Sequence, residues 1–298
     1  MRTTKSFAET REVGNGVVGL VPTMGFLHEG HLSLIEAARA ETDTVVMSLF
    51  VNPLQFDRDD DFARYPRDLE RDVALATAAG ADVVFVPDLE EMYPDEQLTR
   101  VNVIGVSDEL EGPRRPGHFE GVATVVAKLF AGIQPQRSYF GRKDAQQLAV
   151  IRRMARDLSM PVDVIGVPIV RESDGLALSS RNIFLSDDER EAALQLSRGL
   201  LRAADLVEAG ERDAKAITNA VYFEIGDDLS VEYVSLADQD RASPVTALDR
   251  PAFLALAAWS GETRLIDNVH FDRGEGGYVG DRGIRLADRS VLYGTGEG

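Results

Sequence analysis

Residues 17–40 read VVGLVPTMGFLHEGHLSLIEAARA, and this stretch decides the predicted fold. The β-branched run at 17–21 predicts a short buried strand, which the following proline ends. Apolar residues at helical spacing then predict a helix over 32–40. Glycines and histidines fill the loop between the two elements. The segment therefore predicts a strand, a loop and a helix in direct succession.

The same alternation continues along the chain. Further strands are predicted at residues 44–51, 82–86, 138–140 and 162–167, and further helices at 69–79, 121–131 and 145–158. Strands that alternate with helices indicate a parallel sheet with right-handed crossovers. We therefore expect a doubly wound, Rossmann-like α/β domain over residues 1–183, with ligands at the carboxyl ends of its strands.

The pattern changes near Ser186, which forms a capping-box sequence with Glu189 at the start of a long helix. A second helix at 214–225 and strands at 231–236, 252–258 and 263–269 predict a smaller α+β C-terminal domain over residues 184–270. Residues 271–298 are rich in glycine and predict a loosely packed tail. Because this tail lies outside every motif described below, we expect its removal to leave the chemistry intact.

Composition and charge exclude several classes of function. The formal net charge of −18 opposes binding of nucleic acid, which requires basic surfaces that neutralise phosphates. The absence of cysteine excludes disulfides, thiolate nucleophiles and cysteine-based zinc sites. No apolar stretch reaches the length of a membrane span, and the N-terminus lacks the apolar core of a signal peptide. We expect a cytosolic protein without nucleic-acid or membrane partners.

The loop at residues 22–31, PTMGFLHEGH, has features of a phosphate-binding site. It leads into a helix N-terminus, where unpaired N–H groups and the helix dipole attract anions. Gly25 and Gly30 let phosphates approach the backbone, and the imidazoles of His28 and His31 can donate hydrogen bonds to phosphoryl oxygens. Two alternatives remain open from these residues alone. The glycines can simply form a turn with solvated or capping histidines, or the histidines can bind a metal, although neither an HExxH motif nor a third ligand is evident.

A second polar segment, residues 50–56 (FVNPLQF), follows the second predicted strand. The amides of Asn52 and Gln55 at this edge of the sheet can bind a small polar substrate. The alternative is a polar turn in which Pro53 only stops the strand.

Three further segments carry cations. In residues 140–147 (FGRKDAQQ), Lys143 can reach a phosphate, or the segment can merely cap the next helix. Residues 174–182 (DGLALSSRN) combine two serines with Arg181, which suits a triphosphate but also an interdomain linker. Residues 112–119 (GPRRPGHF) form a cationic loop, for which a solvated turn is the simpler interpretation.

Taken together and in this order, the five segments resemble the pantothenate synthetase family of the nucleotidylyltransferase superfamily, with its HIGH and KMSKS elements. The resemblance extends from about Thr3 to Asn268. It implies a cytoplasmic, homodimeric ligase that uses ATP and Mg²⁺. The enzyme would activate (R)-pantoate as an acyl adenylate, pass the acyl group to β-alanine to give pantothenate, and release AMP and diphosphate.

The resemblance also implies roles for particular residues. His31 would be the catalytic proton donor, and we expect His28, Lys143 and Arg181 to act with it on the phosphates. The substrate site is expected to contain Gln55, Gln147, Asn52 and Arg115. Asp72 aligns with a family carboxylate near Mg²⁺, although a solvated helix face is the other interpretation. The residues expected to bind ATP are Met24, Gly25, Phe26, Leu27, His28, Glu29, Gly30, His31, Gly141, Arg142, Lys143, Asp144, Val170, Leu178, Ser179, Ser180 and Arg181.

The chain departs from the family pattern at two positions. Arg142 stands where the family usually carries glutamate, which reverses a charge beside Lys143, and Ala145 replaces an aromatic residue. Two other functions stay open from the sequence. One is a nucleotidylyltransferase that moves AMP to a phosphate acceptor, and the other is a catalytically silent nucleotide sensor. Formation of an amide with β-alanine distinguishes the first, and release of diphosphate distinguishes the second.

Overall fold

The computed structural model describes residues 1–56, 62–63 and 65–294. Over these residues, no helix combines the length and the apolar character that crossing a membrane requires.

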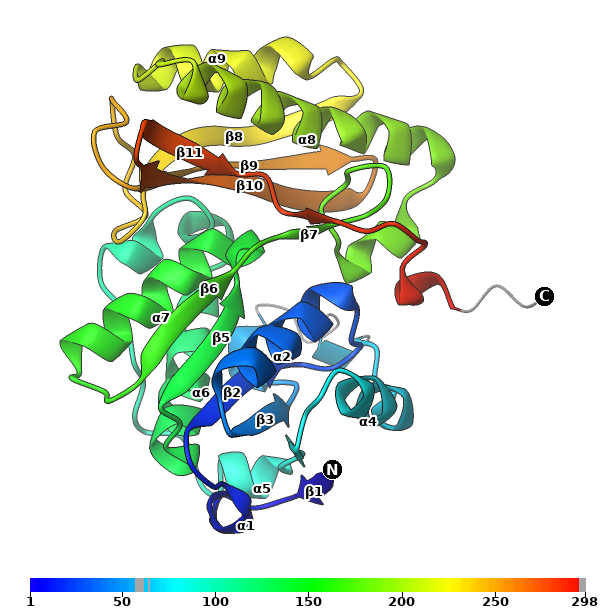
Figure 1. Cartoon of the computed structure of the whole chain (residues 1–298), viewed down its shortest axis with the longest axis vertical. Coiled ribbons are helices and arrows are strands. Elements are labelled where there is room, and N and C mark those ends of the chain that lie inside the picture. Colours follow the sequence, from blue (N-terminus) through cyan, green and yellow to red (C-terminus); the bar gives the residue numbers. More distant parts are fainter. Residues whose placement is uncertain (57–61, 64, 295–298) are drawn as a thin grey trace. The chain divides into compact units, whose positions relative to one another are not determined.

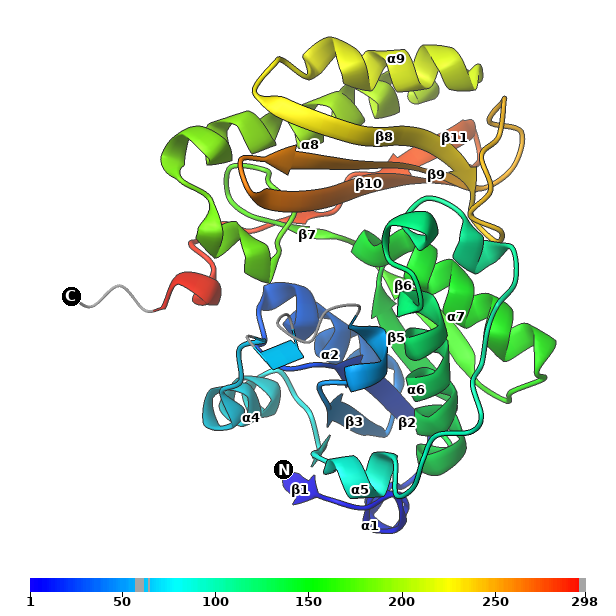
Figure 2. The same ribbon diagram turned by 180° about the vertical axis from the view of Figure 1, so that it is seen from behind.

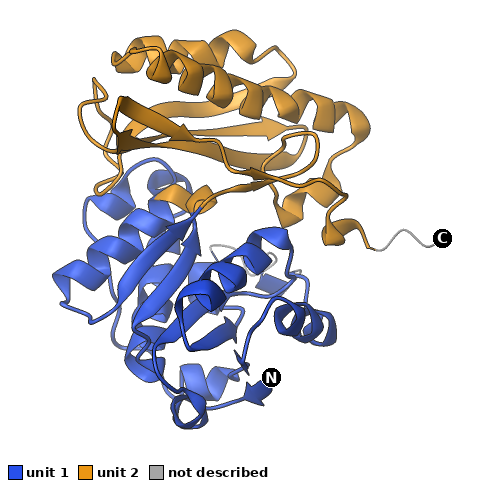
Figure 3. Ribbon diagram, in the orientation of Figure 1, with its two compact units in different colours: residues 1–141, 146–167 blue, residues 142–145, 168–298 orange. Residues whose placement is uncertain are grey.

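The chain divides into two compact units (Figure 3). Unit 1 contains residues 1–141 and 146–167, and unit 2 contains residues 142–145 and 168–298.

Unit 1 is built on a six-stranded sheet in the order β1-β4-β3-β2-β5-β6, and every neighbouring pair is parallel. The predicted parallel α/β sheet is therefore confirmed. Strand order reverses between β2 and β5, so the topological switch point, where such sheets bind ligands, lies between these two strands. The strands are β1 (Arg2–Thr4), β2 (Val18–Thr23), β3 (Thr44–Leu49), β4 (Val83–Phe85), β5 (Arg137–Gly141) and β6 (Asp163–Val167).

Helices cover both faces of this sheet; Figures 1 and 2 show α2 on one face and α6 on the other. On the α2 side, Leu34, Ile35 and Ala38 pack against the buried side chains of β2 and β3. This apolar stripe fixes α2 on the sheet and thereby positions the loop that precedes the helix. The helices of this region are α1 (Phe7–Val13), α2 (Glu29–Glu41), α4 (Leu69–Ala78), α5 (Leu89–Met92), α6 (His118–Ile133) and α7 (Ala145–Asp157), with short 3-10 helices η1 (Pro53–Gln55), η2 (Val106–Asp108) and η3 (Gly112–Arg114). The 3-10 helix η4 (Arg142–Asp144), between β5 and α7 in sequence, belongs to unit 2.

Unit 2 contains a four-stranded antiparallel sheet in the order β11-β10-β9-β8, with α8 and α9 packed on one face (Figure 1). The predicted smaller α+β domain is confirmed, as is the Ser186–Glu189 capping box at the start of α8. The elements are β8 (Leu229–Asp238), β9 (Ala252–Ser260), β10 (Thr263–Gly274), β11 (Gly277–Asp281), α8 (Asp187–Glu208) and α9 (Ala214–Glu224). A parallel pair, β7 (Val170–Arg171) with β12 (Ile284–Arg285), and the 3-10 helices η5 (Ser180–Phe184) and η6 (Val291–Tyr293) complete the unit.

The division of the chain differs from the predicted domains in two respects. Residues 168–183, which the sequence placed in the first domain, belong to unit 2 because β7 pairs with β12 and Arg171 forms a buried ion pair with Asp267. The tail expected to pack loosely instead supplies the end of β10, all of β11 and β12, and η6. The last four residues of that predicted tail lie outside the described residues.

Candidate active site

The loop between β2 and α2 has an unusual backbone that is held from α4. Gly25 has φ +89° and Phe26 has φ +53°, a left-handed conformation that costs a non-glycine residue about 1–2 kcal/mol. Both carboxylate oxygens of Asp72 accept hydrogen bonds from this loop, one from the N–H of Phe26 and one from the N–H of Leu27, each at 2.7 Å. A Cβ at Gly25 would lie 2.9 Å from Asp72 Oδ2, so a side chain here would disturb the same contact. Asp72 therefore fixes the backbone that precedes the two histidines.

Asp72 is only 1% exposed, so the interpretation as a solvated helix face is wrong. The neighbouring Arg71 lies over the ring of Phe26, at 5.2 Å from its centroid, and secures the same loop. Because both Asp72 oxygens accept backbone hydrogen bonds in a buried position, this geometry favours an anchoring role over the predicted role as a magnesium ligand. Within the part of the chain that the structure describes, no group of three or more histidines and carboxylates is placed to hold a metal ion.

His28 and His31 lie at the N-terminus of α2, with ring centroids 4.1 Å apart. The Nδ1 atom of His28 accepts from the N–H of Gly30 at 3.1 Å, and Nδ1 of His31 accepts from the N–H of His28 at 3.2 Å. A nitrogen that accepts a hydrogen bond carries no proton, so the Nε2 atom of each neutral ring is the donor. A Cβ at Gly30 would lie 2.9 Å from the His28 ring, which explains the glycine there. The predicted capping role and the predicted donor role are thus served by opposite nitrogens of the same rings.

The other nucleotide residues predicted in unit 1 surround this turn or end the neighbouring strand. Met24 begins the loop after β2, Glu29 opens α2, and Gly141 ends β5. They therefore lie at the carboxyl ends of β2 and β5, the two strands that flank the switch point.

Asn52 and Gln55 lie together at the carboxyl end of β3. Asn52 is 1% exposed, and its Nδ2 donates to Gln55 Oε1 and to the carbonyl of Gly121, each at 3.1 Å. The Gln55 Nε2 atom lies 2.9 Å from the sulfur of Met24, the first residue of the nucleotide loop. The amide of Gln55 is thus oriented by Asn52, and its donor faces the loop that follows β2.

Arg115 is linked to this amide pair through His118. Arg115 Nη1 lies 3.0 Å from His118 Nε2, and His118 Nδ1 lies 2.8 Å from the carbonyl of Gln55. Since guanidinium only donates, His118 accepts through Nε2 and donates through Nδ1. The structure therefore brings together three of the four predicted substrate residues, Asn52, Gln55 and Arg115.

Two members of this cluster were not predicted as site residues. The sequence placed His118 only in the cationic loop at residues 112–119, although its position at the start of the apolar face of α6 was a usable signal. Tyr93, whose hydroxyl donates to Asn52 Oδ1 at 2.9 Å, follows a short acidic helix and carried no signal in the sequence.

The fourth predicted substrate residue, Gln147, lies half-buried in the first turn of α7. Among the residues that the structure describes, no hydrogen bond joins it to the Asn52–Gln55 pair, so its predicted role stays a prediction. Its neighbour Gln146 is 4% exposed and instead binds the loop at residues 106–111 through three hydrogen bonds.

In unit 2, the η4 turn that carries Lys143 is held by side chains of β10. Asn268 Nδ2 donates to the carbonyls of Arg142 and Lys143 at 3.0 and 2.7 Å, and His270 Nε2 lies 3.2 Å from the Arg142 carbonyl. The Arg142 side chain is paired with Asp272 and Asp281, at 2.7 and 3.1 Å. The positive charge that departs from the family pattern is therefore balanced by two carboxylates, which favours an anchoring role for Arg142 over the predicted contact with ATP.

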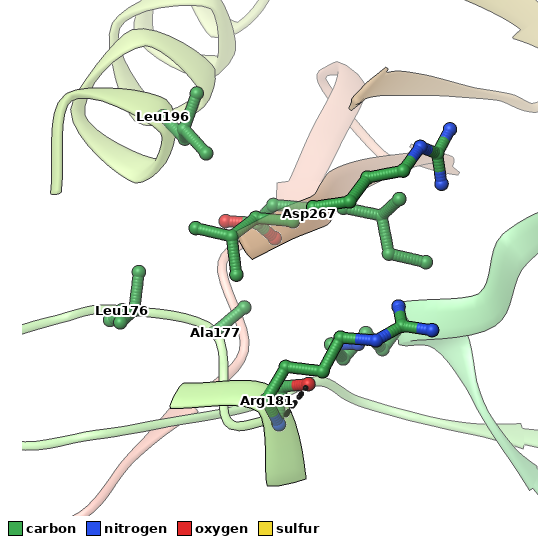
Figure 4. Close-up of a pocket in the computed structure, with 10 residues that line it drawn as sticks. Leu176, Ala177, Arg181, Leu196 and Asp267 are labelled. Atoms are coloured by element: carbon green, nitrogen blue, oxygen red, sulfur yellow. Dashed lines mark hydrogen bonds between the residues drawn. The ribbon is translucent and has the colours of Figure 1, made fainter. Parts of the chain in front are cut away.

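Lys143 also lines a pocket of unit 2 together with two of the predicted phosphate ligands, Ser179 and Arg181 (Figure 4). The Ser179 hydroxyl accepts from the N–H of Arg181 at 3.3 Å and begins η5, while the Arg181 side chain is exposed. The other lining residues are Leu176, Ala177, Leu196, Arg264, Leu265, Ile266 and Asp267. The structure thus brings together three of the five predicted side chains of this unit that can donate to phosphate, and it places apolar side chains beside them.

Arg264 is a further cation of this pocket that was not predicted. Its guanidinium donates to Glu232 Oε2, at 2.7 Å from Nη2 and 3.1 Å from Nε. It was missed because it lies inside a predicted strand, residues 263–269, without a surrounding motif.

The remaining predicted nucleotide residues of unit 2 occupy different environments. Val170 and Leu178 are buried and joined by a backbone hydrogen bond of 2.9 Å, so they shape the loop rather than expose side chains. Ser180 is half-buried in η5, and Asp144 is exposed at the end of η4.

Comparison with known proteins now identifies the family. The sequence model of the Pantoate-beta-alanine ligase family matches residues 1–270. A relative named pantothenate synthetase, from Moorella thermoacetica, is 55% identical over 254 residues, which cover 85% of this chain and 90% of the relative. The chain belongs to the pantoate-beta-alanine ligase family. The predicted family and the predicted enzyme class, a carbon–nitrogen ligase, are thereby confirmed.

Solved structures agree with this assignment. A crystal structure of pantothenate synthetase from Thermus thermophilus aligns with a TM-score of 0.84 and 49% identity, over 90% of this chain and 98% of the other. The pantoate-beta-alanine ligase of Francisella tularensis, solved with a β,γ-ATP ligand and β-alanine, aligns with a TM-score of 0.72 and 33% identity, over 90% of this chain and 97% of the other. The two alternative functions considered from the sequence are not favoured.

Proposed function

We propose that this enzyme condenses (R)-pantoate with β-alanine in two steps, through pantoyl adenylate, with release of diphosphate and AMP. The paired imidazoles at the start of α2 carry this proposal. Both rings accept backbone N–H groups through Nδ1, which commits the Nε2–H groups to donation. Two such donors at a helix N-terminus beside the switch point of a parallel sheet are suited to the phosphates of ATP.

In the first step, a carboxylate oxygen of pantoate attacks the α-phosphorus of ATP, and the bond from that phosphorus to the diphosphate oxygen breaks. Both reactants are anionic, so alignment and positive charge supply most of the catalysis. His28 and His31 are proposed to donate hydrogen bonds to the phosphates, and Lys143 and Arg181 are the cations proposed to stabilise the developing negative charge.

In the second step, the amine of β-alanine attacks the acyl carbon of the adenylate. AMP leaves with the electrons of the carbon–oxygen bond, and the amine loses a proton. The phosphate ester is a far better leaving group than the oxide of a free carboxylate, which explains why the adenylate is formed first.

Asn52, Gln55 and Arg115 are proposed to hold the acid substrate. The amide pair offers neutral hydrogen bonds that do not compete with the phosphate-binding cations, and Arg115 offers a charge for a carboxylate. Gln147 is proposed to complete the site for the acid substrate. The other predicted nucleotide residues are proposed to complete the ATP site, except Arg142, whose pairing with Asp272 and Asp281 favours an anchoring role.

Magnesium enters this proposal only as a partner of ATP. Mg²⁺ is usually bound through substrate phosphates with one or two carboxylates. Asp72 does not fit such a ligand in this geometry, because both of its oxygens accept backbone N–H groups while buried. No step above is therefore assigned to a metal ion bound by the protein.

The proposal extends to the location, oligomeric state and partners of the enzyme. We expect a cytoplasmic homodimer without nucleic-acid or membrane partners, as the family resemblance and the formal charge of −18 indicate.

The experiment that tests the proposed function is an assay of purified enzyme for AMP and for the amide product. AMP release that requires both pantoate and β-alanine, with stoichiometric pantothenate, supports the proposal. Transfer of AMP to a phosphate acceptor without an amide product would instead identify a nucleotidylyltransferase, and nucleotide binding without diphosphate release would identify a sensor.

A further inference from the structure

The residues after the family match contact both proposed ATP-binding segments of unit 2. The match ends at residue 270, whereas described structure continues to residue 294. The two segments are the η4 turn with Lys143 and the loop from Ala177 to Arg181.

At the η4 turn, the extension supplies the carboxylates that hold Arg142. Asn268, His270 and Asp272 alternate along β10, so their side chains point to one face of the strand. The first two bind the backbone of the turn, and Asp272 binds the Arg142 side chain. Asp281, which lies opposite His270 on β11, adds the second carboxylate. The side chains of Arg142 and Asp281 are only 18% and 17% exposed, so solvent screens this pair incompletely.

At the second segment, the extension pairs with β7 and closes on the buried carboxylate of Glu172. Ile284 pairs with Val170, and the N–H of Ile284 donates to the carbonyl of Ile169 at 2.7 Å. Gly283 makes this approach possible, because a Cβ there would lie 2.4 Å from the Ile169 carbonyl.

Glu172 joins the extension to the loop from Ala177 to Arg181. It is 4% exposed, and its Oε1 accepts a hydrogen bond from Asn182 Nδ2 at 2.6 Å. Asn182 directly follows Arg181 in the chain. The Tyr293 hydroxyl donates to both Glu172 oxygens at 3.0 Å and accepts from Arg190 at 2.8 Å. Burial, reinforced by the Glu172 charge, raises the pKa of Tyr293 to about 12, so the hydroxyl remains a donor at neutral pH. Asn182 in turn donates to the carbonyl of Ala177 at 3.1 Å and so spans the loop.

We propose that residues 271–294 are a positioning strap for ATP, which fixes Lys143 through the Asp272–Asp281–Arg142 contacts and Arg181 through the Tyr293–Glu172–Asn182 contacts. This inference rests on the proposed roles of Lys143 and Arg181, and it replaces the expectation that the tail is dispensable. The strap residues touch no substrate in this scheme; they act through the residues they hold.

Steady-state kinetics of full-length Asp281→Asn and Tyr293→Phe test the strap. Each variant weakens or removes a hydrogen bond to a charged group of the strap, so each should raise the KM for ATP roughly tenfold. The KM for β-alanine should change by less than about twofold, because the strap contacts named above lie within unit 2, whereas the proposed substrate residues belong to unit 1. Matched controls are Asp249→Asn, an exposed aspartate paired with Arg250, and Tyr222→Phe, an exposed tyrosine of α9; neither should change the KM for ATP.

Hydrogen exchange of the unliganded variants gives a readout that does not depend on activity. Amides of residues 142–144 should exchange faster in Asp281→Asn, and amides of 177–182 should exchange faster in Tyr293→Phe. A lower melting temperature with an unchanged KM for ATP and unchanged exchange at these segments would overturn the proposal and leave the tail a purely stabilising element.

Lys143→Ala separates failure of the strap from failure of the proposed ATP site. If it raises the KM for ATP while the two strap variants do not, the strap is refuted and the site assignment stands. If Lys143→Ala itself leaves the KM for ATP unchanged, the site assignment is refuted and the strap's proposed role in ATP binding fails with it.

Discussion

Replacing Asp72 with asparagine, a side chain of nearly the same size, should release the nucleotide loop from its binding conformation. Asparagine keeps one acceptor oxygen but turns an NH₂ group toward the second backbone N–H, which loses its partner. The wild-type carboxylate makes two contacts of 2.7 Å in a position that is 1% exposed. A hydrogen bond to a charged group contributes about 1.5–3 kcal/mol to stability, and a neutral one contributes about 1 kcal/mol. The substitution should therefore lower the stability of the folded loop by about 3 kcal/mol.

This cost acts on a loop that is already strained at Phe26, with φ +53°. Each 1.4 kcal/mol corresponds to a factor of ten, so a loop that relaxes away from its binding conformation should raise the KM for ATP by roughly 10- to 100-fold. The melting temperature should fall by roughly 5–10 °C. Titration of initial rates against ATP measures the first effect, and thermal denaturation followed by circular dichroism measures the second.

Asp68→Asn is the matched control, because Asp68 caps the same helix by accepting from the N–H of Arg71 and asparagine is an equally good cap. It should leave both quantities near their wild-type values. An Asp72→Asn enzyme with a wild-type KM for ATP would refute the account of the loop, whatever its melting temperature.

Three substitutions test the other proposed roles. His31→Ala should fold but lose roughly 100-fold or more in kcat, because it removes a donor aimed at developing negative charge; near-native turnover would leave His31 only a capping residue. Gln55→Ala should raise the KM for pantoate more than the KM for ATP, and an ATP-selective defect would reverse the assignment of the Asn52–Gln55 pair. Lys143→Ala should slow adenylate formation by roughly 100-fold in single-turnover measurements, whereas an unchanged rate would remove Lys143 from the phosphate site.

The periodic elements were predictable because their patterns are local. The strand before Pro22, the helix after His31 and the capping box at Ser186 each depend on neighbouring residues, and the structure places each element within a few residues of its predicted range. The motif loops were likewise visible, since glycine, histidine and serine mark turns at the ends of such elements.

Long-range partners were not predictable from the same patterns. Asp72 lies 46 residues from Phe26 in sequence, and Asp281 lies 139 residues from Arg142, so no local pattern indicates either pair. The prediction of a loosely packed tail was wrong for the same reason. Its glycines and charges are typical of an unstructured segment, but β11 pairs with β10 and β12 pairs with β7, and the sequence does not indicate these strand pairs.

Exchange of labelled diphosphate into ATP tests the central claim most directly. The proposed mechanism assigns Lys143 and Arg181 to the phosphates and needs β-alanine only to discharge the adenylate. Pantoate, ATP and magnesium should therefore support exchange in the absence of β-alanine, and omission of pantoate should abolish it. An enzyme that forms pantothenate when β-alanine is supplied, yet shows no pantoate-dependent exchange without it, would contradict the two-step mechanism.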